Sequence, residues 1–271
     1  MKYAIMSDIH GNLEALQAAV ADAKEQGVTK YICLGDVVGY GPYPLKCIQF
    51  AQKTFDTILL GNHEAGTCGK LSITWFSDTA KNGVLYTRSK IGDEERKWME
   101  GLPYTHMESL GNDRFFACAH GTPCQPVEDF DYILDGHAAA MALDEVNRGA
   151  DCNLLFFGHT HSCEYFVSQK GKPKRIYEYY DRTVVEENAV VRLEDGLKYA
   201  VNVGSVGYPR ITFFSSYVIY DTEKNEVHYR VLPFDPLAYA KGLDENGIRR
   251  PSWLLWMIEK PEELQKAKKL K

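Results

Sequence analysis

The sequence predicts an α/β protein built as one domain with two packed sheets. In the first third of the chain, short apolar runs alternate with helical segments, an order that indicates parallel strands covered by helices. From residue 165 onward the pattern instead predicts successive short strands with turn residues between them, as in antiparallel sheets. No Pro-rich or Gly-rich linker separates the two parts, so we expect them to fold together.

The first element is a strand at Tyr3–Met6, where four residues form a short, largely apolar run. Asn12 is expected to cap the next helix, because apolar residues recur every three to four positions from Leu13 to Ala23. Gly27 ends that helix at a position that favours a left-handed residue. A strand, a helix and a second strand are then expected at Tyr31–Leu34, Leu45–Gln52 and Thr57–Leu60.

The middle of the chain is richer in helices, and the later part is richer in strands. Helices are expected at Ser77–Ser89, Asp93–Gly101 and Asp131–Arg148, and strands at Arg114–Ala119 and Asn153–Phe157. The strands expected after residue 160 are Tyr165–Ser168, Ile176–Tyr180, Val184–Val185, Ala189–Leu193, Tyr199–Val203, Ser216–Tyr220 and Val227–Leu232.

Composition excludes several classes of protein. The 31 basic and 37 acidic residues give a net charge of −6, which disfavours stable nucleic-acid binding because that needs a basic face. The longest apolar runs, such as Trp253–Ile258, are far too short to span a membrane, and the first residues do not resemble a signal peptide. The seven cysteines are odd in number and lack CxxC spacing, so we expect free thiols and a cytoplasmic location.

Polar side chains follow five of the expected strands. The segments are Ser7–Asn12, Leu34–Asp36, Leu60–Glu64, Ala119–Gly121 and Phe157–His161. Ligands bind beyond the carboxyl ends of strands in α/β sheets, so we expect these loops to converge. The mixture of carboxylate, amide and imidazole groups suits divalent ions such as Mn, Fe or Zn. The candidate ligands are Asp8, His10, Asp36, Asn62, His120, His159 and His161.

Two of these motifs place ligands at positions i and i+2, Asp8 with His10 and His159 with His161. On an extended backbone this spacing would put both side chains of a pair on the same side. Taken singly, each motif has a structural alternative as a cap, a turn or a helix start. Their joint occurrence, each after an apolar strand, is what indicates a metal site.

The complete set resembles the motifs of the calcineurin-like metallophosphoesterases. That family has the pattern D-x-H, G-D, G-N-H-[D/E], a lone H and G-H-x-H, and every position is filled here between Asp8 and His161. Gly39 and Tyr40 stand where the phosphoprotein phosphatases have Asp and Arg, so the chain looks more like the small bacterial and archaeal phosphodiesterase-like branch. The resemblance covers about residues 1–235 and implies a four-layer α/β/β/α sandwich of two mixed sheets flanked by helices.

The resemblance also implies a role for each ligand and a reaction. The expected cofactors are two divalent metal ions, drawn from Mn, Fe, Zn, Ni or Mg, with Asp36 bridging them. His63 would lie beside the substrate as an imidazolium that stabilises the transition state or protonates the leaving group. The first ion would be held by Asp8, His10 and His161, and the second by Asn62, His120 and His159.

The implied activity is hydrolysis of a small phosphodiester, nucleotide-like or cyclic, by attack of metal-bound hydroxide. A phosphomonoesterase or phosphoprotein phosphatase using the same site is the alternative enzyme. A binding scaffold of the same fold, without catalysis, is the alternative outside the enzymes.

Five further residues are candidates near the site, each with a structural alternative. Tyr40 and Tyr43 either stack on a base or aryl leaving group or pack their own loop. Arg210, in a segment similar to one in the phosphodiesterase-like branch, contacts phosphate or forms a salt bridge. Asn12 supports the ligands or caps its helix. Glu64 orients the histidine before it or starts a helix.

The C-terminal residues differ from the rest of the chain. We expect a metallophosphoesterase domain at residues 1–250 and an extension at residues 251–271, in which an apolar cluster at Trp253–Ile258 precedes a lysine-rich run. Left exposed, the cluster would form a homo-oligomer interface or a lid. Alternatively, the extension packs on its own domain.

Overall fold

The computed structural model describes residues 1–111, 114–123, 130–147, 152–169, 180–185, 187–210 and 212–262. The strands in these ranges are β1 (Lys2–Met6), β2 (Lys30–Cys33), β3 (Thr57–Ile58), β4 (Thr105–Gly111), β5 (Arg114–Ala119), β6 (Cys152–Phe157), β7 (Cys163–Ser168), β8 (Tyr180–Val184), β9 (Ala189–Arg192), β10 (Tyr199–Val203), β11 (Phe214–Asp221) and β12 (Glu226–Pro233). The helices are α1 (Leu13–Glu25), α2 (Pro44–Thr54), α3 (Asn62–Cys68), α4 (Asp78–Lys90), α5 (Asp93–Glu100), α6 (Gly136–Val146), α7 (Pro236–Glu245) and α8 (Ser252–Ile258).

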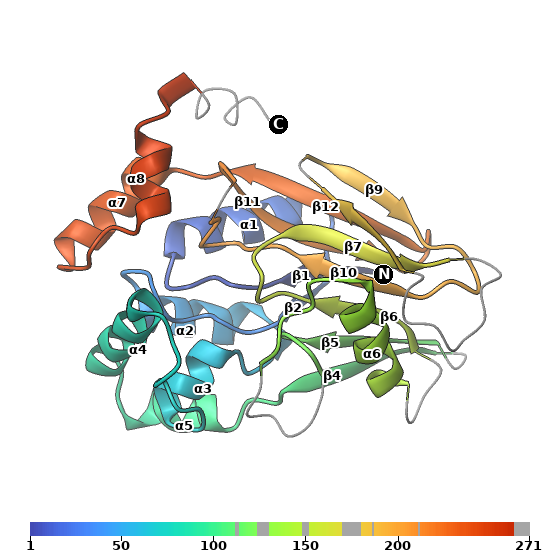
Figure 1. Cartoon of the computed structure of the whole chain (residues 1–271), viewed down its shortest axis with the longest axis horizontal. Coiled ribbons are helices and arrows are strands. Elements are labelled where there is room, and N and C mark those ends of the chain that lie inside the picture. The colour runs from blue at the N-terminus through green and yellow to red at the C-terminus, as the bar shows by residue number, and fades with distance from the viewer. Residues whose placement is uncertain are drawn as a thin grey trace.

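The strands form two mixed sheets (Figure 1). The first has the order β3-β2-β1-β11-β12-β9, in which β1 pairs with β2 in parallel and with β11 antiparallel. The second has the order β4-β5-β6-β10-β7-β8, with parallel pairs at its centre. Each sheet therefore takes strands from both halves of the chain.

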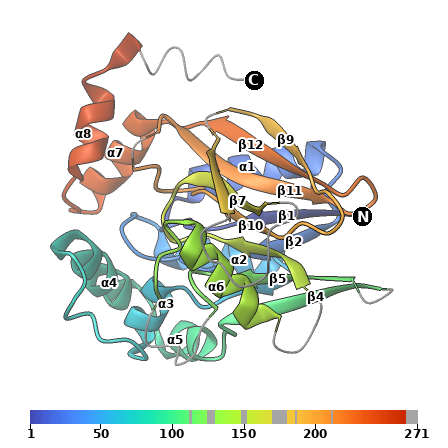
Figure 2. The same cartoon turned by 45° about the vertical axis from the view of Figure 1, so that its right-hand side comes forward.

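Helices cover the outer face of each sheet, which gives the four layers expected from the sequence. Apolar residues of α1 and α2, such as Leu16 and Ile48, are fully buried against the first sheet. Ala139 and Leu143 of α6 pack on the outer face of the second sheet, seen in front of the strands in Figure 2. Between the sheets lies an aromatic core in which the ring of Phe116 contacts those of Tyr3, Phe156 and Tyr220.

Most of the predicted elements are confirmed, with bounds that differ by a few residues. Asn12 caps α1 by accepting a hydrogen bond from the backbone of Ala15, and Gly27 has a φ of +74°. The helix expected from Asp131 begins only at Gly136, because Asp135 accepts the backbone hydrogen bond that caps it. The strand expected at Ile176–Tyr180 lies outside the described residues except for its last residue, which begins β8.

Three elements were not expected from the sequence, namely β4, α7 and α8, and α3 was expected only as one of two alternatives for Glu64. The helix α3 has only seven residues, and β4 alternates exposed and half-buried residues at the edge of its sheet. Both lack a strong hydrophobic pattern, and the packing of neighbouring elements stabilises them instead. Among the described residues, every helix is too short or too polar to span a lipid bilayer.

The C-terminal helices pack against each other. Leu254 and Met257 of α8 are fully buried in a cluster with Tyr239 and Leu243 of α7. The described part of the extension therefore packs on its own domain. The lysine-rich run from residue 263 lies outside the described residues, and both the division at residue 250 and the oligomer interface stay predictions.

Candidate metal centre

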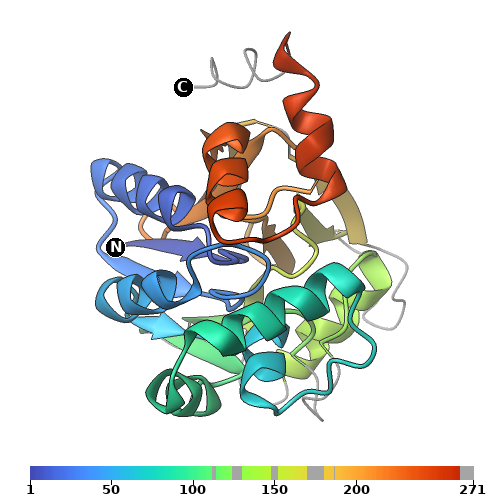
Figure 3. The ribbon, with the colours of Figure 1, turned by 90° about the vertical axis from the view of Figure 1, so that its left-hand side faces the viewer.

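The loops that follow β1, β2 and β6 meet at one end of the molecule, the end that faces the viewer in Figure 3. Hydrogen bonding continues past the strand ends, because the backbone N–H groups of Asp8 and His10 donate to the carbonyls of Gly35 and Asp36. In the same way, Gly158 donates to the carbonyl of His120. The sheets thus carry the ligand-bearing loops to one place, as expected from the sequence.

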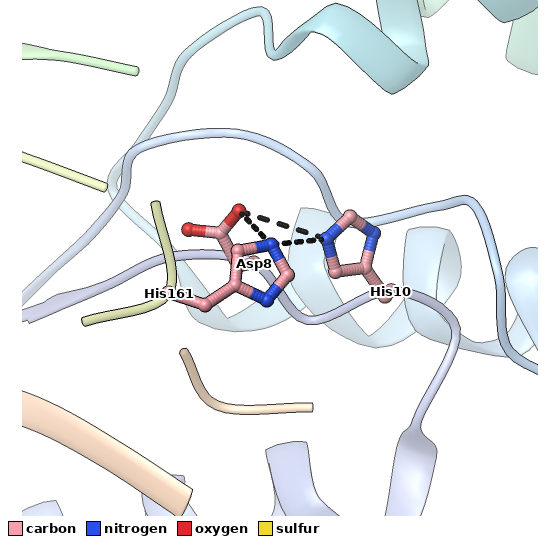
Figure 4. Close-up of side chains that lie close together, drawn as sticks. All are labelled: Asp8, His10 and His161. Carbon is pink, nitrogen blue, oxygen red and sulfur yellow. Dashed lines mark hydrogen bonds and ion pairs between the residues drawn. The ribbon is translucent and has the colours of Figure 1, made fainter. Parts of the chain in front are cut away.

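Asp8, His10 and His161 form the first cluster (Figure 4). The Nε2 atoms of the two histidines lie 3.2 Å apart. The Oδ1 atom of Asp8 lies 3.2 Å from Nε2 of His161 and 3.6 Å from Nε2 of His10. All three side chains are buried, and this carboxylate oxygen has no hydrogen-bond partner among the described residues.

Asp36, His120 and His159 form a second cluster beside the first. Nε2 of His120 lies 3.1 Å from Nδ1 of His159 and 3.1 Å from Oδ1 of Asn62. The Oδ2 atom of Asp36 lies between the two clusters, 3.3 Å from Nε2 of His120 and 3.6 Å from Nε2 of His10. The structure therefore brings together all seven side chains that the sequence suggested as ligands.

The outward nitrogens of the four imidazoles all face backbone carbonyls. Because a carbonyl only accepts hydrogen bonds, these nitrogens must carry the hydrogen. In a neutral ring, the nitrogen that faces the cluster then presents a lone pair, so lone pairs and carboxylate oxygens converge there. This donor set fits a divalent cation at each cluster. The bonds run from His10 to Val38, His120 to Leu34, His159 to Phe130 and His161 to Tyr208, at 2.6–3.2 Å.

The titration of these groups also reflects a site that needs positive charge. Burial opposes ionisation of Asp8, but His161 and His10 outweigh it and hold the pKa of that carboxyl well below its usual range. Burial likewise disfavours a proton on His120, but Asp36 outweighs it and raises the pKa of His120 to about 9. Burial, together with the neighbouring His120, lowers the pKa of His159 to about 3. The buried carboxylates thus favour positive charge beside them.

The backbone corrects one expectation. Asp8 and His10 have φ values of +55° and +48°, and His159 and His161 have +67° and +64°. Neither pair therefore lies on an extended backbone, and successive left-handed turns aim the side chains inward instead. Asp36, at +54°, shares this uncommon conformation. Such backbone strain concentrates at functional sites, where surrounding structure holds it in place.

The pattern that defines the calcineurin-like phosphoesterases matches residues 1–163. An uncharacterized protein of Methanocaldococcus jannaschii is 30% identical over 252 residues, which cover 93% of this chain and 94% of that protein. This chain is a calcineurin-like phosphoesterase. The resemblance found from the motifs is thereby confirmed.

Two solved structures share the fold of this chain. A metallophosphoesterase from Sphaerobacter thermophilus is 26% identical, with a TM-score of 0.75 over 98% of this chain and 99% of that one. A hypothetical protein from Pyrococcus horikoshii OT3 shares the fold at 18% identity, with a TM-score of 0.68 over 95% and 97% of the two chains.

In this calcineurin-like phosphoesterase, Glu64 lies in the first turn of α3, which confirms the helix-start alternative, and it has a further role. Its fully buried carboxylate accepts backbone hydrogen bonds from Asp36, Val38 and Gly61, at 2.7, 2.9 and 3.0 Å. It caps α3 and at the same time ties the loop that carries Asp36 to that helix. Asn12 likewise does two things, since it caps α1 and donates to the carbonyl of Gly207.

Two positioning residues were missed from the sequence. The amide of Asn202 donates to the hydroxyl of Thr160 at 2.7 Å, within the His159–His161 turn. The hydroxyl of Ser205 donates to the carbonyl of Asp8 at 2.9 Å. In the segment that contains both residues, the sequence suggested only Arg210 as a candidate. Hydrogen bonds between residues so far apart in the chain leave no local sequence pattern.

His63 lies against the first cluster, and its ring packs on Gly39. A Cβ atom at Gly39 would stand 2.0 Å from Nδ1 of His63, so only glycine leaves room for the ring. Nδ1 has no hydrogen-bond partner among the described residues. Burial lowers the pKa of His63 to about 3, which Asp36 only partly opposes. Burial thus favours the neutral ring, and the role of His63 as an imidazolium stays a prediction.

A cavity of about 640 Å³ opens at the candidate metal centre, and its lining includes Asp36, Asn62, His63 and His159. Arg210 lies in its wall, with Nη2 3.4 Å from Nε2 of His161, and forms no salt bridge with a carboxylate among the described residues. Tyr40 lines it too, but its ring stacks on that of Tyr208 at 4.2 Å. The structure places Tyr43 outside this cavity, against Gly242 of α7.

Proposed function

We propose that this phosphoesterase hydrolyses small phosphodiesters and holds two divalent metal ions. The observation that carries the proposal is the convergence of imidazole lone pairs and carboxylate oxygens in two adjacent clusters, with one oxygen of Asp36 between them. Asp8, His10 and His161 would hold one ion, and Asn62, His120 and His159 the other. Asp36 would bridge them.

Two bound divalent ions would supply positive charge that neutralises the phosphoryl oxygens and promotes ionisation of water. Side chains of the protein would bind the phosphate and stabilise the leaving oxygen. Arg210, beside His161, would bind a non-bridging phosphoryl oxygen. In the hydrolysis, a water oxygen would bond to phosphorus as the ester P–O bond breaks, and a proton that the water releases would pass to the leaving oxygen. The ring of His63 would donate the hydrogen bond that stabilises this oxygen.

Two features favour a diester over a monoester. A diester carries one negative charge, and Arg210 is the one Arg or Lys side chain among the described residues that line the cavity. A second cavity of about 600 Å³ shares Tyr40, Thr79, Tyr208, Pro251 and Ser252 with the first. The first cavity therefore adjoins further space, which would accommodate the second ester arm of a diester.

The test compares two substrates on protein reconstituted with Mn²⁺, with metal content measured on the same sample. We expect hydrolysis of bis(p-nitrophenyl) phosphate with kcat/KM above that for p-nitrophenyl phosphate. Asp36→Asn should lose activity and bound metal, while Asp93→Asn, an exposed change at the start of α5, should lose neither.

Each other outcome points to a specific alternative. A clear preference for the monoester would overturn the diester assignment in favour of a phosphatase. If neither substrate is hydrolysed although two ions bind per chain, the catalytic proposal fails and a binding scaffold of this fold is the better account.

A further inference from the structure

Trp75 has an unusual environment for a tryptophan. It lies in the loop between α3 and α4 and is 93% exposed. It lines the cavity over the candidate metal centre, next to Phe76, whose ring lies 5.5 Å from that of His63. Large apolar side chains that stay in water beside a ligand cavity are typical of binding sites.

The cavity as a whole is rich in aromatic side chains. Seven of its twenty described lining residues are Phe, Tyr or Trp, about three times their 12% share of the chain. Such a lining favours a planar apolar group on the ligand, because stacking needs flat surfaces on both partners.

Most of these rings already have an aromatic partner. Tyr40 stacks on Tyr208, and Tyr132 stacks on the imidazole of His159 with ring centres 4.1 Å apart. Trp253 stacks on Tyr239 at 6.0 Å. Within the described ranges, no ring or cation packs on Trp75. Trp75 thus offers the open aromatic face of the cavity.

We infer that one ester arm of the substrate carries a planar aromatic group, such as a nucleobase, which stacks on Trp75 while the phosphate lies at the clusters. This inference rests on the proposed function and specifies its substrate class. The sequence suggested Tyr40 and Tyr43 for this stacking, but Tyr40 is already stacked on Tyr208 and Tyr43 lies outside the cavity. We therefore assign the stacking to Trp75. Stacking on a base is tolerant of base identity, so we expect little preference among bases.

The experiment measures the binding of two product-like ligands that differ only in the base. Dissociation constants of AMP and ribose 5-phosphate are measured by calorimetry on Mn²⁺-loaded protein, so the readout does not depend on turnover. We expect AMP to bind at least about fivefold more tightly, the lower end of a base–aromatic stack. Trp75→Ala should abolish this ratio, and Trp75→Phe should restore part of it.

Trp256→Ala is the matched control, because Trp256 is 37% exposed and its ring lies against Phe213, outside the cavity lining. It should leave the ratio unchanged. Equal binding of the two ligands to the unmodified protein, or a ratio that survives Trp75→Ala, would overturn the inference. If the diester is hydrolysed but AMP and ribose 5-phosphate bind equally well, only the aromatic subsite is refuted. If AMP binds more tightly but no diester is hydrolysed, the subsite stands and the proposed reaction is refuted.

Discussion

The position of His63 can be tested without changing His63 itself. In Gly39→Ala the new Cβ would stand 2.0 Å from Nδ1 of His63, whereas ordinary contacts begin near 3.4 Å. The ring must therefore move by about 1.4 Å, the difference between these distances. A displacement of about 1 Å in an active site can cost about 10²-fold in rate. We expect kcat/KM for bis(p-nitrophenyl) phosphate to fall by about that factor, with the metal ligands intact.

The substitution also strains the backbone, and the chain offers a control for that effect. Gly39 has a φ of +92°, and Gly69, which ends α3, has +90°, but a Cβ atom at Gly69 would meet nothing within 4 Å. Either alanine in the left-handed region costs about 1–2 kcal/mol. At about 2–4 °C per kcal/mol for a chain of this size, both variants should show a lower Tm. Gly69→Ala should keep its activity because it leaves His63 in place.

The assay pairs steady-state kinetics with calorimetric Mn²⁺ binding and thermal unfolding for both variants. Equal activity of Gly39→Ala and Gly69→Ala would refute the reasoning, since the clash with His63 would then be without effect on catalysis. Loss of Mn²⁺ binding by Gly39→Ala would show that the ligand loops moved, and it would attribute the lost activity to the metals.

Three other predictions concern stability. Asp22 accepts hydrogen bonds from Tyr217 and two from Arg230, and although burial opposes it these bonds lower the pKa of Asp22. Asp22→Asn should lower the free energy of unfolding in urea by about 2 kcal/mol at pH 7. The contribution of Asp22 is present above its unfolded pKa and is lost as the pH falls through the lowered folded pKa. The difference in unfolding free energy between the variant and the parent protein should therefore narrow between pH 5 and pH 3, and a constant difference would contradict this prediction. Chelation by EDTA should remove about 2.7 kcal/mol of stability relative to protein at 100 times the metal Kd, seen as a lower Tm, and Asp36→Asn should not respond to EDTA. Phe156 is fully buried between the sheets against Phe116 and Tyr220, so Phe156→Ala should lower the free energy of unfolding by about 3–5 kcal/mol. A decrease below about 1 kcal/mol would show that neighbouring side chains fill the space left by the ring.

The sequence by itself determined the parts of this protein that local chemistry encodes. Strands such as β5 and β10 lie where apolar runs predict them, and the cap of α1 by Asn12 follows from its own turn. The family and the seven candidate ligands were also readable, because each ligand follows its strand within a few residues. Parallel strands bring the loops of their own sheet to one edge, so the sequence could group the ligands of each sheet. The ligands come from two sheets, however, and the packing of these sheets decided that the two groups meet.

Only the tertiary structure decided the features that depend on distant residues. Each sheet combines strands from distant parts of the chain, as in the pairing of β1 with β11. A local sequence pattern does not decide which strands pair, or in which register. The hydrogen bonds of Glu64 to the Asp36 loop and the contact of the His63 ring with Gly39 join segments that lie far apart in the chain. The exposure of Trp75 likewise depends on which segments pack beside it. Hydrogen bonds and van der Waals contacts act over a few ångströms in space, whatever the separation in sequence, so folding has to bring these residues together before their roles exist.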